Sequence, residues 1–548
     1  MSAVATTAAA PPRRLVKHGI LGWLVTTNHK QIGILYICTT LVFFLIAGFL
    51  ADVIRLQLAG PQQNFVSPHT YNEVFTLHGT AMIFLFIAPF GFGIANFLIP
   101  LQCGAADMAF PRLNAFGYWL FLLGGLTVFS GVFAAGGGAS AGWYAYTPLS
   151  DIRVSSGIGQ DLWFIGLTLT SISGILTAIN FLVTPIVFRA PGMTMWRLPV
   201  FTWEMIATSL LILMAFPPLT AAFAMALMDR HANAHFFDPT RGGDPVLYQH
   251  TFWFFGHPEV YVMILPMFGV ITEVIAVFSR KPVFGYTGLV LSAFAIAGLS
   301  MGVWAHHMFT TGAVNDPFFS AMSFLIAVPT GIKFFNWIAT MWRGAISFET
   351  PMLFAIGFLL NFLVGGITGV MVASPPIDFQ ANGSYFLVSH FHYTLGGGSM
   401  FAIFAALYFW FPKIWGVKLD ERWGRFNFWT MFVGFNVTFA PMLFLGMMGM
   451  PRRVYTYPAI PAWHDLNLLA SIGTAIITIS VASFAWNVIV SSRKREALPE
   501  DPWGSAYTLE WATSSPPPEL NFDSLPPIRS KRPAFDKHHP ELAHTSPP

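Results

Sequence analysis

Charged residues and cysteine are both scarce in this sequence, and each shortage excludes whole classes of protein. Of the 548 residues only 10% are charged, against about 25% in an ordinary soluble domain, whereas 55% are hydrophobic and 16% are aromatic. A mean hydropathy of +0.60 leaves too little polar surface to cover a soluble fold of this size. The composition predicts a polytopic membrane protein and excludes a coiled coil, a disordered chain and a nucleic-acid-binding protein.

The two cysteines, Cys38 and Cys103, form no CxxC or CxxCH motif. A disulfide framework, a thiolate metal centre and a covalently attached c-type haem are therefore not expected within this chain. The first 30 residues lack an apolar core, so no cleaved signal peptide is expected either.

Long apolar runs dominate the rest of the chain. A helix needs about 20 apolar residues to span a bilayer. Twelve runs meet that length: 31–51, 73–99, 116–135, 161–188, 200–227, 251–279, 285–312, 318–341, 348–373, 385–411, 425–450 and 465–491. The sequence predicts an all-α integral membrane protein, a bundle of twelve transmembrane helices.

The predicted domain organisation is simple. Residues 1–30 form an N-terminal segment, 31–491 the twelve-helix domain, and 492–548 a proline-rich tail. Proline and charge in the tail favour an extended segment in water.

Lysine and arginine are distributed unevenly between the two sides of the predicted bundle. An even number of spans puts both termini on one side, and that side collects seventeen lysines and arginines up to Arg495, before the C-terminal tail is counted. The loops of the other side have six arginines and no lysine. By the positive-inside rule, both termini are predicted to be cytoplasmic.

Six of the sixteen histidines lie inside predicted spans: His78, His257, His306, His307, His390 and His392. Each lies roughly 8–10 Å below the outer end of its helix, at a rise of about 1.5 Å per residue. Polar neighbours within the bundle explain one or two such histidines. Six imidazoles at one depth in a bilayer favour metal ligation.

Spacing sorts these histidines into candidate ligand sets. His390 and His392 would leave a helix about 200° apart, so that one helix could serve two cofactors. His78 with one of this pair would make a bis-histidine haem site, and the other histidine would be a single axial ligand. Spacing alone does not decide which of the two belongs to which site.

A second set combines His306 and His307, about 100° apart on a helix, with His257 from the neighbouring span. Three imidazoles suit copper, zinc or non-haem iron, and spacing does not choose among them.

The segments around these histidines resemble those of haem–copper terminal oxidases. Residues 253–261 (Trp-Phe-Phe-Gly-His-Pro-Glu-Val-Tyr) are similar to the copper-ligand helix of that family, and residues 304–309 and 390–393 to its two companion motifs. Residues 449–453 (Gly-Met-Pro-Arg-Arg) resemble the segment that contacts haem propionates. The resemblance runs from about Asn28 to the last span, and it is to subunit I of an A-type, cytochrome c oxidase-like enzyme.

The resemblance implies a low-spin haem, expected to be haem a, a high-spin haem, expected to be haem a3, and one copper ion. Dioxygen would bind between the high-spin iron and the copper. The implied ligands are His78 and His392 for the low-spin haem iron, His390 for the high-spin haem iron, and His257, His306 and His307 for copper.

Three ionisable residues lie well inside predicted spans: Glu259, Glu273 and Lys333. A charge at such depth is a functional candidate, although Glu273 is near enough to the inner end for an ion pair or snorkelling to explain it. Lys333 has Thr330 on nearly the same face and no predictable acidic partner, which suits a proton carrier. The resemblance implies that Lys333 and Thr330 belong to the K pathway, with Thr272 at a matching hydroxyl position.

Glu259 follows a proline, whose missing N–H leaves a carbonyl free in mid-helix and can admit water. By themselves, a loop aspartate and three asparagines near the inner side are ordinary surface and packing groups. The resemblance maps Asp107, Asn96, Asn114 and Asn180 onto a D pathway that ends at Glu259.

Tyr261 lies one turn after His257, so the two side chains share a helix face. The resemblance implies that this tyrosine is covalently joined to the copper histidine and supplies an electron and a proton for O–O cleavage. Its presence argues against the related nitric oxide reductases, which lack it.

The resemblance also implies residues around the haems. Arg55 resembles the arginine bonded to the low-spin haem formyl group, and Phe391 lies between the two haem ligands. Positions that match haem edges or propionates are Tyr71, Trp143, Asp378, Tyr385, Arg452 and Arg453.

Three positions depart from the family pattern. Asn382-Gly383 replaces a His-Asp pair that helps to bind magnesium, so magnesium is doubtful as a cofactor. Gln57 stands where many relatives have a glutamate at a calcium or sodium site, and Glu273 where the mitochondrial pattern has histidine. Together these departures favour a bacterial enzyme.

The sequence thus predicts the catalytic subunit of a proton-pumping terminal oxidase in the bacterial cytoplasmic (inner) membrane. Expected partners are a subunit II with a dicopper centre, subunit III, cytochrome c as electron donor, dioxygen and the lipid bilayer; the sequence leaves a respiratory supercomplex open. A quinol oxidase is the alternative, because this chain has no cysteine pair from which to judge the donor. A secondary transporter fits twelve spans and broken helices but not six histidines at one depth.

Overall fold

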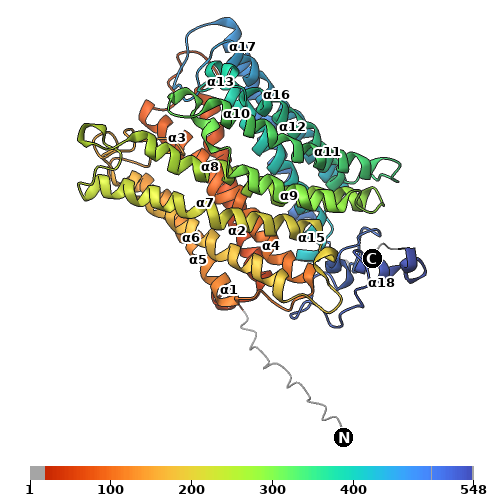
Figure 1. Cartoon of the computed structure of the whole chain (residues 1–548). Coiled ribbons are helices and arrows are strands. Elements are labelled where there is room, and N and C mark those ends of the chain that lie inside the picture. The colour runs from red at the N-terminus through yellow and green to blue at the C-terminus, as the bar shows by residue number, and fades with distance from the viewer. Residues whose placement is uncertain (1–18, 495–496, 546–548) are drawn as a thin grey trace.

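The structure is a computed structural model that describes residues 19–494 and 497–545. These residues are helical and irregular; their only strand-like pairings are the isolated bridges Gly138–Gly159 and Ser384–Pro451. Twelve spans in the described chain are long and apolar enough to cross a membrane, which confirms the predicted all-α bundle. Their long helices pack side by side (Figure 1).

Eight of these spans carry one main helix each: His29–Gln57 (α2), Pro111–Ser130 (α5), Ile158–Val187 (α6), Val200–His231 (α7), Pro245–Phe278 (α8), Thr350–Val372 (α12), Glu421–Met447 (α16) and Pro461–Ser491 (α17). The four others are made of consecutive segments: Pro68–Thr80 (α3), Ala81–Ile87 (η1) and Ala88–Cys103 (α4); Tyr286–Ser300 (α9) and Trp304–Thr311 (η5); Asp316–Leu325 (α10) and Ala327–Met341 (α11); and Tyr385–Phe391 (α14), His392–Met400 (η6) and Phe401–Trp415 (α15).

Short elements connect or flank the spans: Ile20–Leu24 (α1), Gly131–Phe133 (η2), Met195–Arg197 (η3), Pro239–Arg241 (η4), Pro375–Ala381 (α13), Leu509–Ala512 (η7), Pro533–His538 (α18) and Pro540–Thr545 (η8). Several helices begin at side-chain caps. Asn28 accepts from the amides of Lys30 and Gln31 at the start of α2, and Asp420 caps α16 in the same way.

The interrupted spans differ from the continuous helices that the sequence favours, and three of the interruptions adjoin histidines. A π-helical segment (η1) follows His78, and another (η6) begins at His392. The span expected at 285–312 stops at Ser300, turns at Gly302 and continues as a 3₁₀ segment that carries His306. Such irregular turns are frequent at functional sites, because they redirect side chains.

A proline accounts for the fourth interruption. Pro329 has no N–H to offer Leu325, the residue four positions earlier, and its ring crowds that carbonyl. The helix accordingly divides between Leu325 and Ala327 into α10 and α11.

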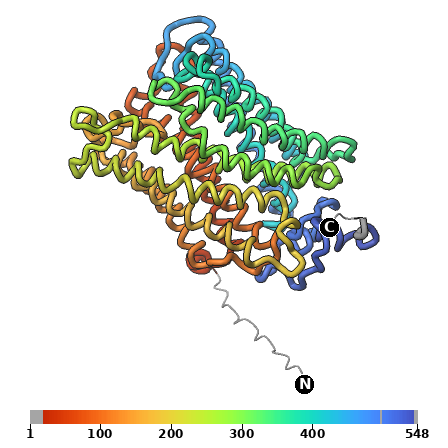
Figure 2. The backbone as a smooth tube through the Cα atoms, in the orientation of Figure 1, coloured from red at the N-terminus to blue at the C-terminus, as the bar shows by residue number. Residues whose placement is uncertain are grey.

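The start of α2, the loop between α4 and α5, and the C-terminal segment lie at one end of the bundle, which we call the terminal end. In Figure 1, α1 and α18 mark this end and α13 lies at the opposite end. The blue C-terminal tube in Figure 2 runs back and forth beside the terminal end of the helices.

The C-terminal segment is packed against the terminal end, which differs from the extended segment that its composition favours. Leu509 and Trp511 are fully buried. Lys413 Nζ, on α15, donates to the Thr513 carbonyl at 2.6 Å, and Asn521 Nδ2 donates to the Ala105 carbonyl at 2.8 Å. A few apolar and amide anchors between the prolines hold the segment, and overall composition does not reveal them.

Candidate functional site

A single large cavity brings together the six histidines that the sequence singles out. Its volume is about 1400 Å³, and His78, His257, His306, His307, His390 and His392 all line it. A drug-sized ligand occupies a pocket of about 300–1,000 Å³. This cavity is therefore large enough for more than one such group.

Three imidazoles converge on one point of the cavity. His257 comes from α8, and His306 and His307 come from η5; one nitrogen of each lies within 4.8 Å of the others. His307 Nε2 is 3.4 Å from His257 Nδ1 and 3.2 Å from His306 Nε2. Three imidazole nitrogens facing one another without a carboxylate suit one copper, zinc or iron ion.

Neighbouring side chains fix the orientation of these imidazoles. His306 Nδ1 is 2.7 Å from the Ser323 hydroxyl, so its Nε2 is left for a ligand. The Trp253 ring stacks on His307 with centroids 3.9 Å apart. Outer contacts of this kind are typical of metal-ligating histidines. The sequence analysis did not identify Ser323 as a partner of His306, because the two residues are 17 positions apart and lie on different helical segments.

His78 and His392 face each other across another part of the cavity. Their rings are 6.4 Å apart and nearly parallel, at 15°. Two imidazoles on opposite sides of one metal, each with a bond of about 2 Å, would have ring centroids about 6 Å apart. His78 Nδ1 lies 2.9 Å from the Ala47 carbonyl and His392 Nδ1 lies 2.8 Å from the Val388 carbonyl, which leaves both Nε2 atoms for a metal.

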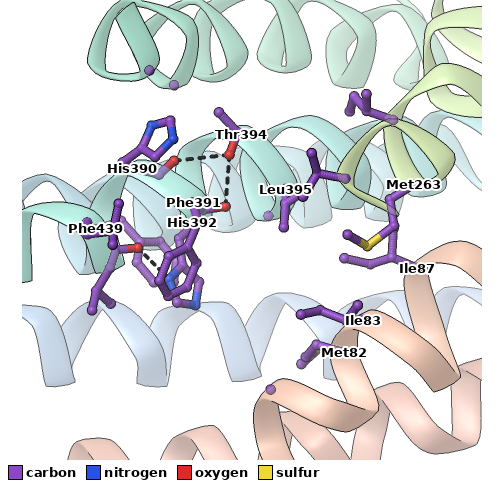
Figure 3. A pocket seen from close by; sticks show the side chains of 18 of the residues that line it. Met82, Ile83, Ile87, Met263, His390, Phe391, His392, Thr394, Leu395 and Phe439 are labelled. Carbon is purple, nitrogen blue, oxygen red and sulfur yellow. Dashed lines mark hydrogen bonds between the residues drawn. The ribbon is translucent and has the colours of Figure 1, made fainter. Parts of the chain in front are cut away.

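His390 leaves the same helix on the side opposite to His392 (Figure 3), as their spacing predicts. Its Nδ1 is 3.0 Å from the Thr368 hydroxyl. Gly369 faces this ring, and a Cβ atom there would lie 3.1 Å from His390 Cε1. The glycine thus leaves room for the imidazole, and no second histidine of the described residues faces His390 as His78 faces His392.

Three arginines, Arg55, Arg452 and Arg453, line the cavity that contains the paired histidines. Arg55 donates from Nη2 to the Asn467 carbonyl at 2.7 Å, but its Nη1 is buried without a hydrogen-bond partner among the described residues. The Arg453 guanidinium lies over the Tyr144 ring at 4.0 Å, and Arg452 donates to the Tyr144 hydroxyl at 3.1 Å. Burial lowers the pKa of Arg453. Adjacent arginines in such a setting are suited to bind carboxylates.

The remaining predicted haem-edge residues line the same cavity: Tyr71, Trp143, Asp378 and Tyr385. Asp378 is buried on α13, where burial raises the pKa of its carboxyl to about 6. Asn382 Nδ2 is 3.3 Å from Asp378 Oδ2. The loop that carries Asn382 is fixed by the Arg452 amide, which donates to the Gly383 carbonyl at 2.8 Å.

Glu259 lies between the large cavity and a second, much smaller one. It lines both, the small one having a volume of about 20 Å³. That volume exceeds the ~10–15 Å³ that a water molecule needs. Glu259 Oε2 is buried and has no hydrogen-bond partner in the described chain.

The predicted D-pathway residues lie between Glu259 and the terminal end. Asp107 Oδ1 accepts from the Met108 amide at 2.8 Å. Asn114 Nδ2 donates to Asn96 Oδ1 at 2.6 Å, and Asn180 Oδ1 accepts from the Phe110 amide at 2.8 Å. The structure therefore brings the three asparagines close to the loop that carries Asp107.

Two hydroxyl groups that sequence reasoning missed continue this line. Ser173, seven residues from Asn180 on α6, lines the small cavity with Glu259. The Tyr36 hydroxyl is 3.1 Å from Ser173 Oγ. A spacing of seven residues puts Ser173 and Asn180 on one helix face, so periodicity could have found the serine.

Lys333 has an acidic partner, so the expectation of none is wrong. Its Nζ lies 2.5 Å from Glu204 Oε1, and both side chains are completely buried. Glu204 lies in the first two turns of α7, at the terminal end of that helix, and the sequence analysis does not single it out. Thr330, one turn from Lys333, lines the large cavity.

Tyr261 lines the large cavity beside His257, with ring centroids 4.8 Å apart. His257 Nε2 is buried and without a hydrogen-bond partner within residues 19–494 and 497–545. Phe391 also lines this cavity, next to both haem-ligand candidates of its helix.

Comparison with known proteins gives concordant results. A family model described as "Cytochrome C and Quinol oxidase polypeptide I" matches residues 31–476. A probable cytochrome c oxidase subunit 1-beta of Nocardia farcinica is 53% identical over 99% of this chain and 92% of the relative. Cytochrome c oxidase subunit 1 of Corynebacterium efficiens is 52% identical over 97% of this chain and 92% of its own length.

A solved structure shares the fold. A heme-copper terminal oxidase dimer, determined by cryo-EM, matches with a TM-score of 0.74 over 85% of this chain and 84% of the other. The two are 18% identical in sequence, so this likeness bears on architecture alone.

Proposed function

The chain belongs to the family of cytochrome c and quinol oxidase polypeptide I, and on that premise we propose that it is the catalytic subunit of a proton-pumping cytochrome c oxidase. It is a multi-pass membrane protein and an oxidoreductase of the respiratory chain that uses haem and copper. The observation that carries the proposal is the arrangement of six histidines around one cavity in a facing pair, a single histidine and a triad.

The donor atoms fit the implied cofactors. His78 and His392 would hold the low-spin haem, in our proposal haem a, and His390 would hold the high-spin haem, haem a3. His257, His306 and His307 would hold the copper ion. Bound together, these groups would carry electrons to dioxygen and reduce it to water.

The chain's own residues orient these cofactors. The unpartnered Nη1 of Arg55 suits the formyl oxygen of the low-spin haem. Arg452 and Arg453 supply positive charge for propionates, and Tyr71, Trp143, Asp378 and Tyr385 line the haem edges. Asn382 and Gly383 offer no carboxylate in their loop, so we expect any magnesium site to be lost or relocated.

Proton supply is assigned to two groups of side chains. Protons from Asp107 would pass the asparagines, Ser173 and the small cavity to Glu259, whose free carboxylate oxygen suits a proton relay. Lys333 and Thr330 would supply protons to the cavity at Tyr261. Tyr261 lies beside His257, and we propose that it is joined to that histidine and gives a proton during O–O cleavage.

Orientation and partners follow from the charge pattern and the relatives. We propose that the terminal end faces the cytoplasm of a bacterium and that the chain lies in the cytoplasmic (inner) membrane. Other oxidase subunits, cytochrome c and dioxygen are its partners. We further propose a subunit II with a dicopper centre and a subunit III; the names of the relatives favour cytochrome c over quinol as donor.

Oxygen consumption by the purified complex tests this function. We expect turnover with reduced cytochrome c, little with a quinol, and none in His307→Ala, because that change removes one of three copper ligands. His69→Ala, a change at an exposed histidine outside the cavity, is the matched control and should respire normally. Turnover with quinol alone would overturn the choice of donor, and normal respiration by His307→Ala would overturn the site.

A further inference from the structure

The Lys333–Glu204 ion pair is completely buried, and a contribution to folding stability is a poor explanation for it. Nζ and Oε1 are 2.5 Å apart, neither side chain is exposed, and Nζ also donates to the Leu289 carbonyl at 3.1 Å. Apolar replacement of such a pair is often neutral or stabilising, because both charges lose their hydration. Stability therefore does not account for the pair.

The pair has a chemical property that an apolar contact lacks. An ammonium with a carboxylate, and an amine with a carboxylic acid, carry the same net charge, so one proton can move between the two groups without adding charge to the interior. Glu204 Oε2 is buried without a hydrogen-bond partner among the described residues, which leaves that oxygen available to a second proton donor.

Glu273 contacts α7 about one helical turn from Glu204, on the side of the terminal end. Its Oε1 accepts from the Phe201 amide at 3.4 Å. Phe201 is three residues before Glu204 on α7, so the two share a face about one turn, ~5 Å, apart. Glu273 is itself buried on α8.

Tyr507 of the C-terminal segment connects this position to the surface. Its hydroxyl donates to Glu273 Oε2. The ring is only partly buried, whereas Glu273, Glu204 and Lys333 are all buried. Four groups that can exchange a proton, on Tyr507, Glu273, Glu204 and Lys333, therefore follow one another from the terminal end into the bundle of this one chain.

We propose that Glu273 and Glu204 form the proton entry to Lys333, with Tyr507 at its mouth. The inference rests on the Lys333 route proposed above and adds the residues that load it. Glu204 in its acid form gives a proton to the Lys333 amine, which becomes an ammonium. The Glu204 carboxylate then takes a proton from Glu273 through intervening water, and Glu273 is reprotonated past Tyr507. No electron moves in these steps.

Stopped-flow reduction of the high-spin haem in the whole complex tests the entry. Glu204→Gln should slow reduction at least 10-fold, and Lys333→Met should slow it to a similar extent, because neither variant keeps the exchangeable pair. Glu204→Asp should restore part of the rate. Glu273→Gln and Tyr507→Phe should slow it several-fold, and the Glu204→Gln/Lys333→Met double variant should be no slower than Lys333→Met. Reduction of the low-spin haem should remain fast in all of them.

Glu519→Gln is the matched control. Glu519 is an exposed acid of the same C-terminal segment, so the change removes one carboxyl from that segment without altering the proposed series. This variant should reduce the high-spin haem at the wild-type rate. A wild-type rate in Glu204→Gln beside a slow Lys333→Met would overturn the entry alone. A slow Glu519→Gln would also overturn it, by showing a general effect of the segment, whereas a fast Lys333→Met would contradict the Lys333 route itself.

Discussion

Gln57 stands where the family resemblance implies a glutamate at a calcium or sodium site, and here its amide makes four hydrogen bonds of its own. It is completely buried, and its Nε2 donates to the carbonyls of Gln63 at 2.7 Å and Tyr455 at 3.1 Å. Its Oε1 accepts from the amides of Phe65 at 2.9 Å and Val66 at 3.1 Å. The amide thus supplies the positive partner that two carbonyl oxygens would otherwise take from a cation.

Gln57→Glu should therefore create a need for calcium. The carboxylate would face two carbonyl oxygens without a donor, at a cost of about 1–3 kcal/mol. We expect a lower thermal midpoint that added calcium restores, and no calcium response in the wild type. Gln63→Glu adds the same charge at an exposed position of this loop and should show neither effect. Equal calcium responses in the wild type and Gln57→Glu would contradict this reading.

Residues in local motifs could be predicted from the sequence, whereas partners from distant segments could not. The six histidines were found because imidazoles are conspicuous in apolar helices and their motifs are short. Glu204 was missed because its partner Lys333 is 129 positions away, and helix periodicity does not specify which helices adjoin. The same limit applies to Tyr507 and Glu273.

Three of the four interrupted spans depart from a regular helix near the candidate metal-ligating histidines. The number of spans follows from hydropathy, and twelve were expected and found. The π segments after His78 and from His392, and the 3₁₀ segment of His306, could not be predicted from periodicity. Their turns depend on packing around the cavity rather than on local residue preferences.

Docking of the C-terminal segment against the helices can be tested by removing one of its buried side chains. Trp511 is fully buried against Lys413 of α15, so Trp511→Ala should leave a cavity that costs about 3–5 kcal/mol in the binding of the segment. Limited proteolysis should then cut the segment much faster than in the wild type. Leu520→Ala, at an exposed apolar residue of the same segment, is the control and should be cut at the wild-type rate. Equal rates for the two variants would show that Trp511 does not anchor it.

In the molecule as a whole, the two sets of residues that we propose to carry protons approach one cavity from the same end. Moving one charge against 100 mV costs about 2.3 kcal/mol, so pumping requires that protons pass a controlled branch point. Glu259 is suited to this position because it lines both the small cavity and the large one.

Asp107→Asn should slow oxygen consumption and abolish proton release in vesicles, since the entry group can no longer ionise. Glu259→Gln should block turnover more completely, because no protonatable group remains at the branch. Asp523→Asn removes an exposed carboxyl from the terminal end and should pump normally. Normal pumping by Asp107→Asn would exclude this route.

Measuring the haem and copper content of purified complexes would show whether the six histidines hold three redox groups. We predict two haems and one copper at this site per chain in the wild type. His307→Ala should lose one copper and keep both haems, and His78→Ala should lose the low-spin haem. A single haem in the wild type, or full copper in His307→Ala, would contradict the account.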